Sequence, residues 1–169
     1  MEKKLNHLLA DLVVEYHKLQ SFHWYLKGYH FFDDHAKLEE YYDAIAEAVD
    51  TVAEDMLMLG FKPESTMKGF LSISSIEEAK NQEVTSVEAY EAVLADFKYL
   101  LDEVKGVKAA ADEINKKMDE DMRSNPAWNH LKAVENHKVF FLPSDLFLLN
   151  PGVRTPEAME KLYDLAYNG

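Results

Sequence analysis

The chain has 169 residues and a mass of 19.5 kDa, a length that favours a single domain able to form a core without disulfides. Its 18 lysines and arginines against 31 aspartates and glutamates give a net charge of −13, which argues against a phosphate-binding surface. The absence of cysteine excludes disulfides, zinc–thiolate sites and thiol catalysis.

The N-terminal region predicts an amphipathic helix. Apolar residues recur at intervals of three and four from Leu5 to Leu26, and the stripe ends near Gly28. Polar residues such as Asp11 and Glu15 interrupt it and no cleavage site follows, so we expect no signal peptide. No apolar run reaches the ~18 residues of a transmembrane helix, and we expect a cytoplasmic protein.

A second long helix is predicted next. Asp33 or Asp34 is a good N-cap for it, and the apolar pattern continues to Leu59. Gly60 then supplies a C-terminal cap and Pro63 prevents continuation. A long connection follows.

The later elements begin at sequences typical of helix N-termini. A capping box at Ser75–Glu78 predicts a short helix within the connection, and a second box at Thr85–Glu88 begins a third long helix. Ser124–Pro126 predicts the start of a fourth helix that ends at Pro143, and Thr155–Glu157 begins a last short one.

These elements predict an all-α fold, a four-helix bundle with a short helix in its long crossover connection. Both halves of the chain are needed to close such a core, so we expect one domain over residues 1–169. Residues 144–169 form an extra C-terminal segment in this scheme.

The second helix carries the residues with the clearest chemistry. His35, Glu39, Asp50 and Glu54 share one broad face at about 100° per residue. Imidazole nitrogen with carboxylate oxygen is a ligand set suited to iron or manganese. A row of carboxylates along one helix face is also typical of an ordinary solvent-exposed face that binds no metal. His23 lies on the apolar stripe of the first helix, where a hydrogen-bonded core histidine is the plainer interpretation.

The spacing constrains how such a site is built. At about 1.5 Å per residue, Glu39 and Asp50 are ~16 Å apart along one straight helix, too far to share an ion. If all four residues are ligands, a two-fold partner must lay its own second helix antiparallel and supply the other pair. No glutamate is followed by histidine three residues later, so a metal site inside one bundle is not expected. The other histidines have no paired carboxylates and are expected to have surface or supporting roles: His7, His17, His30, His130 and His137.

These residues resemble the signature of the Dps-type miniferritins of the ferritin-like superfamily. The resemblance covers roughly residues 5–105. It rests on the segment Phe22–Gly28, the pair Phe31 and Phe32, the spacings His35-x-x-x-Glu39 and Asp50-x-x-x-Glu54, and the later segments Gly60–Pro63, Thr66–Lys68 and Ser74–Ile76.

The resemblance implies a ferritin-like four-helix subunit that assembles into a hollow dodecamer with ferroxidase sites at two-fold interfaces. One subunit would contribute His23, His35 and Glu39 as iron ligands, and its partner Asp50 and Glu54. Fe(II) would be oxidised there, preferentially by hydrogen peroxide, and stored inside as ferric mineral. The implied protein is a ferroxidase of the bacterial cytoplasm that protects against oxidative stress.

The chain also departs from the family pattern. Glu39 stands where the family often has aspartate, and it is long enough to ligate. Asp55 stands where arginine is common, so a supporting ion pair is missing or reversed. The last third matches less well, and residues 144–169 match nothing in the family.

Direct DNA binding is not expected. Members of the family that bind DNA tend to have lysine-rich tails, whereas only Lys3 and Lys4 precede the first predicted helix.

Two alternatives with little ferroxidase activity remain open. One is a nucleoid-associated DNA-binding cage, and the other is a protein-binding cage that acts through the C-terminal segment with its apolar run Phe147–Leu149.

Overall fold

The computed structural model describes residues 1–127, 129–136, 138–139 and 159–164. The chain divides into two compact units, Met1–Lys108 and Ala109–Gly169, so the expected single domain stays a prediction. Residues 159–164 are helical, and the other elements in chain order are α1 (Glu2–Tyr25), β1 (Leu26–Lys27), α2 (Phe31–Met58), α3 (Met67–Ile73), β2 (Val84–Thr85), α4 (Ser86–Ser124) and α5 (Lys132–Glu135).

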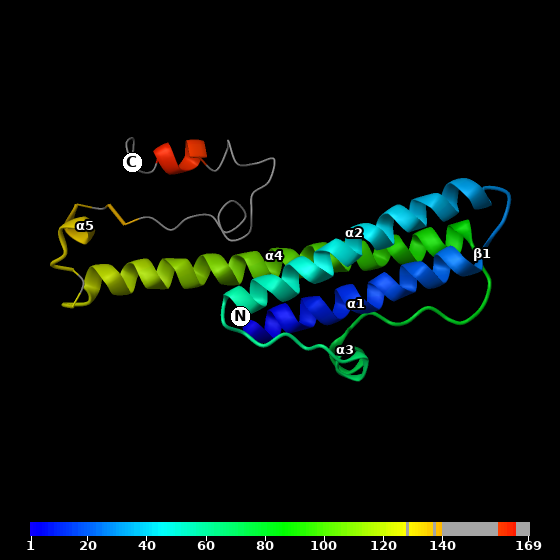
Figure 1. Cartoon of the computed structure of the whole chain (residues 1–169), viewed down its shortest axis with the longest axis horizontal. Helices are drawn as coiled ribbons and strands as arrows, with labels where there is room; N and C mark the ends of the chain where they lie inside the picture. The colour runs from blue at the N-terminus through cyan, green and yellow to red at the C-terminus, as the bar shows by residue number, and fades with distance from the viewer. Residues whose placement is uncertain (128, 137, 140–158, 165–169) are drawn as a thin grey trace. The chain divides into compact units, whose positions relative to one another are not determined.

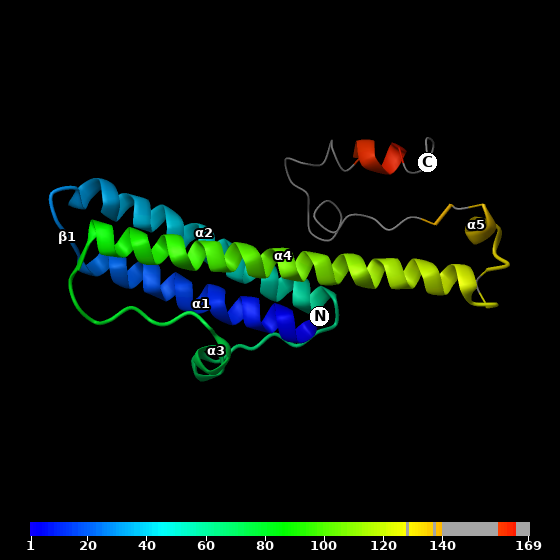
Figure 2. The same ribbon diagram turned by 180° about the vertical axis from the view of Figure 1, so that it is seen from behind.

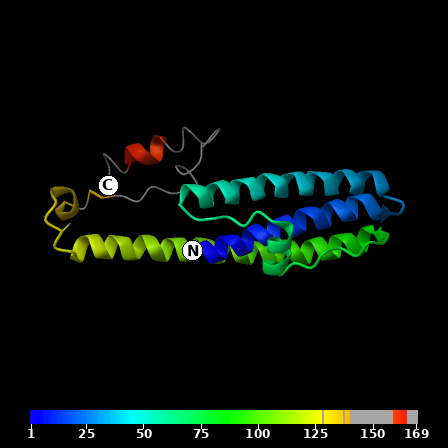
Figure 3. The same cartoon turned by 60° about the horizontal axis from the view of Figure 1, so that its bottom comes forward.

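The first unit is a helical bundle of α1, α2 and the part of α4 up to residue 108 (Figures 1, 2 and 3). α1 runs antiparallel to the other two helices, whereas α2 and α4 run in the same direction. Parallel neighbours need a connection that returns along the whole bundle, and residues 59–85 make it. The all-α crossover architecture predicted from the sequence is therefore confirmed.

Apolar side chains from all three helices meet in the core. Leu19, Leu38 and Val93 are buried in one cluster near the β1 end of the bundle. Met56 and Phe70 are buried in a second cluster that joins the end of α2 to α3 and the start of α1. In the three long helices these buried residues recur at helical spacing, which is why the periodicity predicted those elements.

One carboxyl group lies inside this core. Glu15 of α1 is fully buried, and burial raises its pKa to about 9. The charge of Asp96 contributes to this rise, whereas the charge of Lys18 opposes it. Asp96 and Lys18 form an ion pair at 2.6 Å. Because its pKa is about 9, Glu15 is uncharged at pH 7 beside this ion pair.

The short helix of the connection lies earlier than predicted. It is α3, and Thr66 caps it by accepting a hydrogen bond from the backbone N–H of Gly69 at 3.1 Å. The segment predicted to be helical, from Ser75, is not helical. Its backbone N–H groups at Ser75 and Ile76 donate to the Asp11 carboxylate, and that of Ile76 also donates to the Ser74 hydroxyl oxygen, so this segment is hydrogen-bonded to α1 and forms no helical turn.

Other helix ends match the prediction closely. Thr85 and Glu88 form the predicted capping box, with Glu88 Oε2 accepting from the Thr85 backbone N–H at 2.9 Å. α2 begins at Phe31, two residues before the first predicted cap, because the acidic pair Asp33 and Asp34 occupies its first turn rather than the cap position. β1 and β2 form a two-residue parallel pair, too short to leave a period in the sequence.

The fourth long helix is not observed in the described residues that follow α4. Ser124 donates its hydroxyl to the carbonyl of Glu120 at 2.8 Å and is the last residue of α4 rather than the cap of a new helix. Asn125 accepts from the backbone N–H of Ala127 at 2.9 Å, which makes a local turn. α5 contains just four residues. The prediction of a helix from this point to Pro143 was therefore wrong over the described part.

The remaining C-terminal predictions fall largely outside the described residues. This holds for Pro143, for the run Phe147–Leu149, for most of segment 144–169 and for the predicted helix start Thr155–Glu157. Among the residues that are described, no helix is both long and apolar enough to cross a membrane.

Candidate metal centre

Two of the predicted ligands meet where α1 ends and α2 begins. His23 lies in the last turn of α1 and His35 in the second turn of α2, and the antiparallel hairpin brings them face to face. Their rings stack with centroids 3.4 Å apart and an interplanar angle of 18°. His23 is buried and His35 half-buried, so the pair sits at the edge of the core.

Reciprocal hydrogen bonds hold the two rings. Nδ1 of His23 donates to the carbonyl oxygen of His35, and Nδ1 of His35 donates to the carbonyl oxygen of His23, both at 2.8 Å. A neutral imidazole that donates from Nδ1 keeps the lone pair on Nε2. The same arrangement fixes metal-binding histidines in proteins, where the second nitrogen is hydrogen-bonded to a carbonyl or carboxylate. Both Nε2 atoms are therefore in the form that binds a metal ion.

Aromatic rings surround the histidine pair. Phe31 stacks on His35 at 4.9 Å, and Tyr42 meets His23 edge-on at 5.4 Å. Burial raises the pKa of Tyr42, and the charges of Glu39 and Asp43 and a hydrogen bond with Glu39 raise it further. The Tyr42 hydroxyl therefore stays protonated and orients the Glu39 carboxylate one turn from His35.

The predicted carboxylate ligands lie on the exposed side of α2. Glu39, Asp50 and Glu54 are all exposed, and α2 continues without interruption from Phe31 to Met58. The ~16 Å separation of Glu39 and Asp50 along an unbroken helix therefore applies to the folded chain. One protomer brings His23, His35 and Glu39 to one end of α2 and leaves Asp50 and Glu54 near the other.

Asp55 departs from the family pattern without altering this face. Its side chain is half-buried, its Oδ1 atom is buried, and burial raises its pKa, as does the charge of Glu54. Whether a supporting ion pair is missing or reversed at Asp55, as the sequence predicts, stays a prediction.

Sequence reasoning missed a second group of metal-ligating side chains. One potential ligand atom from each of His7, Asp11 and Glu103 lies within 4.8 Å of the others. The expectation that His7 has no paired carboxylate was therefore wrong. The i, i+4 spacing of His7 and Asp11 was visible in the sequence, but Glu103 comes from α4, 96 residues away from His7.

Comparison with known proteins agrees with this architecture. Residues 2–125 match the family model of the ferritin-like domain. DNA protection during starvation protein 2 of Bacillus anthracis is 40% identical over 133 residues, which cover 79% of this chain and 88% of that protein.

Solved structures of Dps proteins are also similar to this chain. The crystal structure of a Dps protein from Bacillus brevis has a TM-score of 0.65 at 35% identity and covers 80% of this chain and 88% of that one. The Dps protein of Vibrio cholerae O1, described as a member of the ferritin-like diiron-carboxylate proteins, has a TM-score of 0.66 at 28% identity over 69% of this chain and 72% of that one. With its crossover bundle and its histidine pair between α1 and α2, the chain belongs to the Dps-type miniferritins of the ferritin-like superfamily.

Proposed function

We propose that this chain is a ferroxidase subunit that oxidises Fe(II), preferentially with hydrogen peroxide, and stores ferric mineral inside a closed homo-oligomer, a dodecamer. The observation that carries the proposal is the His23–His35 pair, because its reciprocal backbone bonds leave both Nε2 atoms available to iron. The diiron-carboxylate description of the Vibrio cholerae relative supports iron as the metal. Iron is substrate and cargo here.

Each site is completed by the α2 helix of a second subunit. Positions 35 and 54 share their midpoint with positions 39 and 50, between Ala44 and Ile45. A two-fold axis at that midpoint places Glu54 of the partner subunit opposite His35 and Asp50 of the partner subunit opposite Glu39. One isologous interface therefore yields two equivalent sites, each with two histidines and three carboxylates.

The same axis explains two exposed apolar side chains. It pairs Phe32 with Leu57 of the partner subunit, and in the single chain these residues are 84% and 61% exposed. Phe32 lies about 20° from Glu39 around the helix, and Leu57 lies about 20° from Asp50, so both flank the ligand face. Covering them on assembly removes apolar surface from water and excludes solvent from the site.

The ligand set suits two-electron chemistry. Two Fe(II) ions each give one electron to one hydrogen peroxide molecule, its O–O bond breaks, and two protons complete two water molecules. Because both electrons arrive at one site, no hydroxyl radical is released. Carboxylates stabilise the Fe(III) that forms, since they are hard anionic ligands.

The test measures Fe(II) oxidation by peroxide under anaerobic conditions in the Asp50→Ala/Glu54→Ala variant. We expect the rate to fall by at least about tenfold, because each site loses two of its ligands. Glu40→Ala is the matched control, since Glu40 is exposed on α2 but lies about 100° from Glu39 around the helix. Size-exclusion chromatography checks that both variants still assemble. Equal rates in wild type and the double variant would show that these carboxylates are an ordinary solvated face.

Protection of DNA, the activity in the names of several relatives, is proposed here to be indirect. The net charge is −13. The sequence predicts Lys3 and Lys4 before the first helix, but α1 begins at Glu2, so both lysines lie inside it. We expect no shift of plain duplex DNA at physiological salt. Removal of peroxide and Fe(II) in the bacterial cytoplasm would protect DNA without contact. The C-terminal protein-binding alternative stays a prediction.

A further inference from the structure

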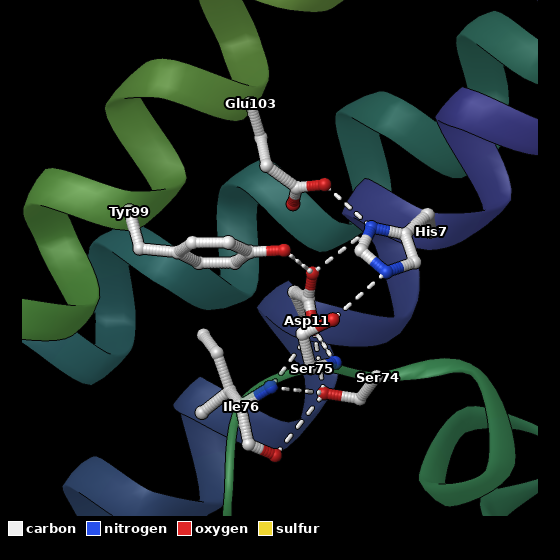
Figure 4. A network of polar contacts seen from close by, with 7 residues as sticks. All are labelled: His7, Asp11, Ser74, Ser75, Ile76, Tyr99 and Glu103. Carbon is white, nitrogen blue, oxygen red and sulfur yellow. Dashed lines mark hydrogen bonds and ion pairs between the residues drawn. The ribbon is translucent and has the colours of Figure 1, made fainter.

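A polar cluster that includes no side chain of α2 joins three parts of the first unit (Figure 4). His7 and Asp11 project from α1, Glu103 projects from α4, and Ser75 comes from the connection after α3. His7 Nδ1 lies 2.5 Å from Glu103 Oε1 and 3.3 Å from Asp11 Oδ2. His7 Nε2 lies 3.1 Å from the Ser75 hydroxyl, so Nδ1 is the nitrogen that faces the two carboxylates.

Asp11 is fixed in place by the connection. Its Oδ1 atom accepts from the Ser74 hydroxyl and the Ser75 backbone N–H, both at 2.6 Å, and from the Ile76 backbone N–H at 3.2 Å. Burial acts to raise the pKa of Asp11, but these hydrogen bonds outweigh it and the pKa is lowered. The carboxylate is fully buried and ionised, and its second oxygen, Oδ2, points into the cluster toward the Tyr99 hydroxyl, which donates to it at 3.2 Å.

Glu103 completes the cluster with an unsatisfied oxygen. Its Oε1 atom contacts His7, whereas its Oε2 atom is buried and receives no hydrogen bond from the described residues. Burial raises the pKa of Glu103, and the approach of Asp11 raises it further, which His7 opposes. A buried oxygen without a donor is costly, and the Asp11 and Glu103 carboxylates, which share a hydrogen bond, can approach this closely only with a proton or a metal cation between them.

The side-chain chemistry decides which cation fits. One imidazole nitrogen and two carboxylate oxygens form a ligand set typical of divalent transition metals such as Zn(II) or Mn(II). An open surface cavity of about 530 Å³, lined by His7 and Glu103 and also by Tyr99, gives an ion and its remaining water ligands access to the cluster. Lys3 and Lys4 line the same cavity, but neither forms an ion pair with Asp11 or Glu103.

We propose that His7 Nδ1, Asp11 Oδ2 and the Glu103 carboxylate bind one divalent transition-metal ion, at a site separate from the ligand face of α2. The ion replaces the proton that His7 otherwise shares with Glu103. The three ligands come from α1 and α4, and Ser75 of the connection contacts His7. The bound ion therefore links the connection to both helices.

A direct test uses the intact wild-type protein. Crystals soaked in Zn(II) are measured at the zinc absorption edge, and the expected result is an anomalous peak between His7, Asp11 and Glu103. Peaks on the α2 face are a separate outcome that concerns the ferroxidase proposal alone. Absence of a peak at the cluster, with zinc present elsewhere in the crystal, would show that a proton on His7 is the sole cation there.

A binding experiment in solution tests the proposed metal site independently. Zn(II) titration by calorimetry is compared in Asp50→Ala/Glu54→Ala and in the same background with His7→Gln and Glu103→Gln added. We expect the added changes to remove one zinc equivalent per chain and the zinc-dependent rise in melting temperature. His17→Gln with Asp102→Asn is the matched control, since both residues lie outside the cluster on the same two helices. Unchanged stoichiometry and unchanged melting response in the His7 and Glu103 variant would overturn the proposal.

Discussion

Glu15 is an acidic residue in a place where a helical bundle normally has an apolar one. Because burial raises its pKa to about 9, the folded protein keeps a proton there that the unfolded chain releases above its ordinary pKa of 4.5. The stabilising contribution of that proton is complete below pH 4.5 and is lost as the pH rises toward 9. Raising the pH into the mildly alkaline range therefore lowers the free energy of unfolding through this single buried side chain.

The substitution Glu15→Gln tests this. Glutamine keeps an N–H donor for Asp96 but carries no proton that can be lost, so the variant should gain stability over wild type as the pH rises. We expect little difference in melting temperature at pH 4.5 and a gain of about 5 kcal/mol in the free energy of unfolding at pH 8.5, since each pH unit between the two pKa values contributes about 1.4 kcal/mol. Melting curves at both pH values measure it. Glu91→Gln, at an exposed site on α4, should show no such pH trend.

The residues of the candidate sites differ in how well the sequence predicts their arrangement. The spacing of His35, Glu39, Asp50 and Glu54 follows from helix geometry, so an unbroken α2 was enough to predict it. The mutual backbone bonds of His23 and His35 depend on the turn between two helices, and no periodicity encodes that. Glu103 approaches His7 only through the packing of α4 against α1, which is equally invisible in a linear pattern.

Helix ends follow local rules, and the end of α2 is a good example. The backbone N–H of Phe61 donates to the carbonyl of Met56 at 2.8 Å, and that of Gly60 donates to Leu57 at 3.0 Å. This is a Schellman motif, with Gly60 at a φ of 75° and Phe61 packed in the Met56 cluster. The motif fixes the last turn of the helix that carries Glu54.

Gly60→Ala is expected to destabilise this helix end. The space around Gly60 is open to a methyl group, so the cost comes from the left-handed backbone alone, about 1 kcal/mol. The change should lower the melting temperature by a few degrees, whereas Gly60→Asn should recover part of the loss because asparagine tolerates this conformation. Gly106→Ala, in the interior of α4 with no close neighbour, should be neutral or stabilising. A drop of similar size at both positions would contradict this account.

Elements were predicted correctly where the local signal had no tertiary competitor. The Thr85 capping box and the Gly60 cap use only neighbouring backbone groups, and both form as expected. The Ser75 capping box fails because the Asp11 carboxylate takes the same backbone donors from across the bundle. The Ser124–Pro126 signal fails because the serine is used to end the preceding helix.

The proposed function makes assembly decisive for the whole molecule, because two of the five ligands of each proposed iron site come from another chain. The net charge of −13 per chain makes close association costly unless apolar surface is covered in return. Phe32 and Leu57 supply such surface at the two ends of the α2 ligand face, and the proposed two-fold partner would cover both at once.

The Phe32→Ala/Leu57→Ala variant should therefore lose affinity between subunits and ferroxidase activity together. Sedimentation velocity at several concentrations should show dissociation at a concentration at least about tenfold higher than for wild type. Met58→Ala is the control, since Met58 is 53% exposed but lies about 100° from Leu57 around the helix. The exchange Phe32→Leu/Leu57→Phe should restore assembly, because it preserves the apolar volume of each pair. Failure of the exchange to restore any association would contradict the proposed pairing.

The reciprocal bonds between His23 and His35 tie iron binding to the accuracy of folding. A slip of one residue between α1 and α2 moves each carbonyl by about 1.5 Å and turns it by about 100°, so both bonds fail together. A chain folded out of register would then present neither imidazole correctly and, under the proposed function, would not take up iron at that site. The proposed iron site would therefore form only in chains whose α1–α2 hairpin is in the correct register.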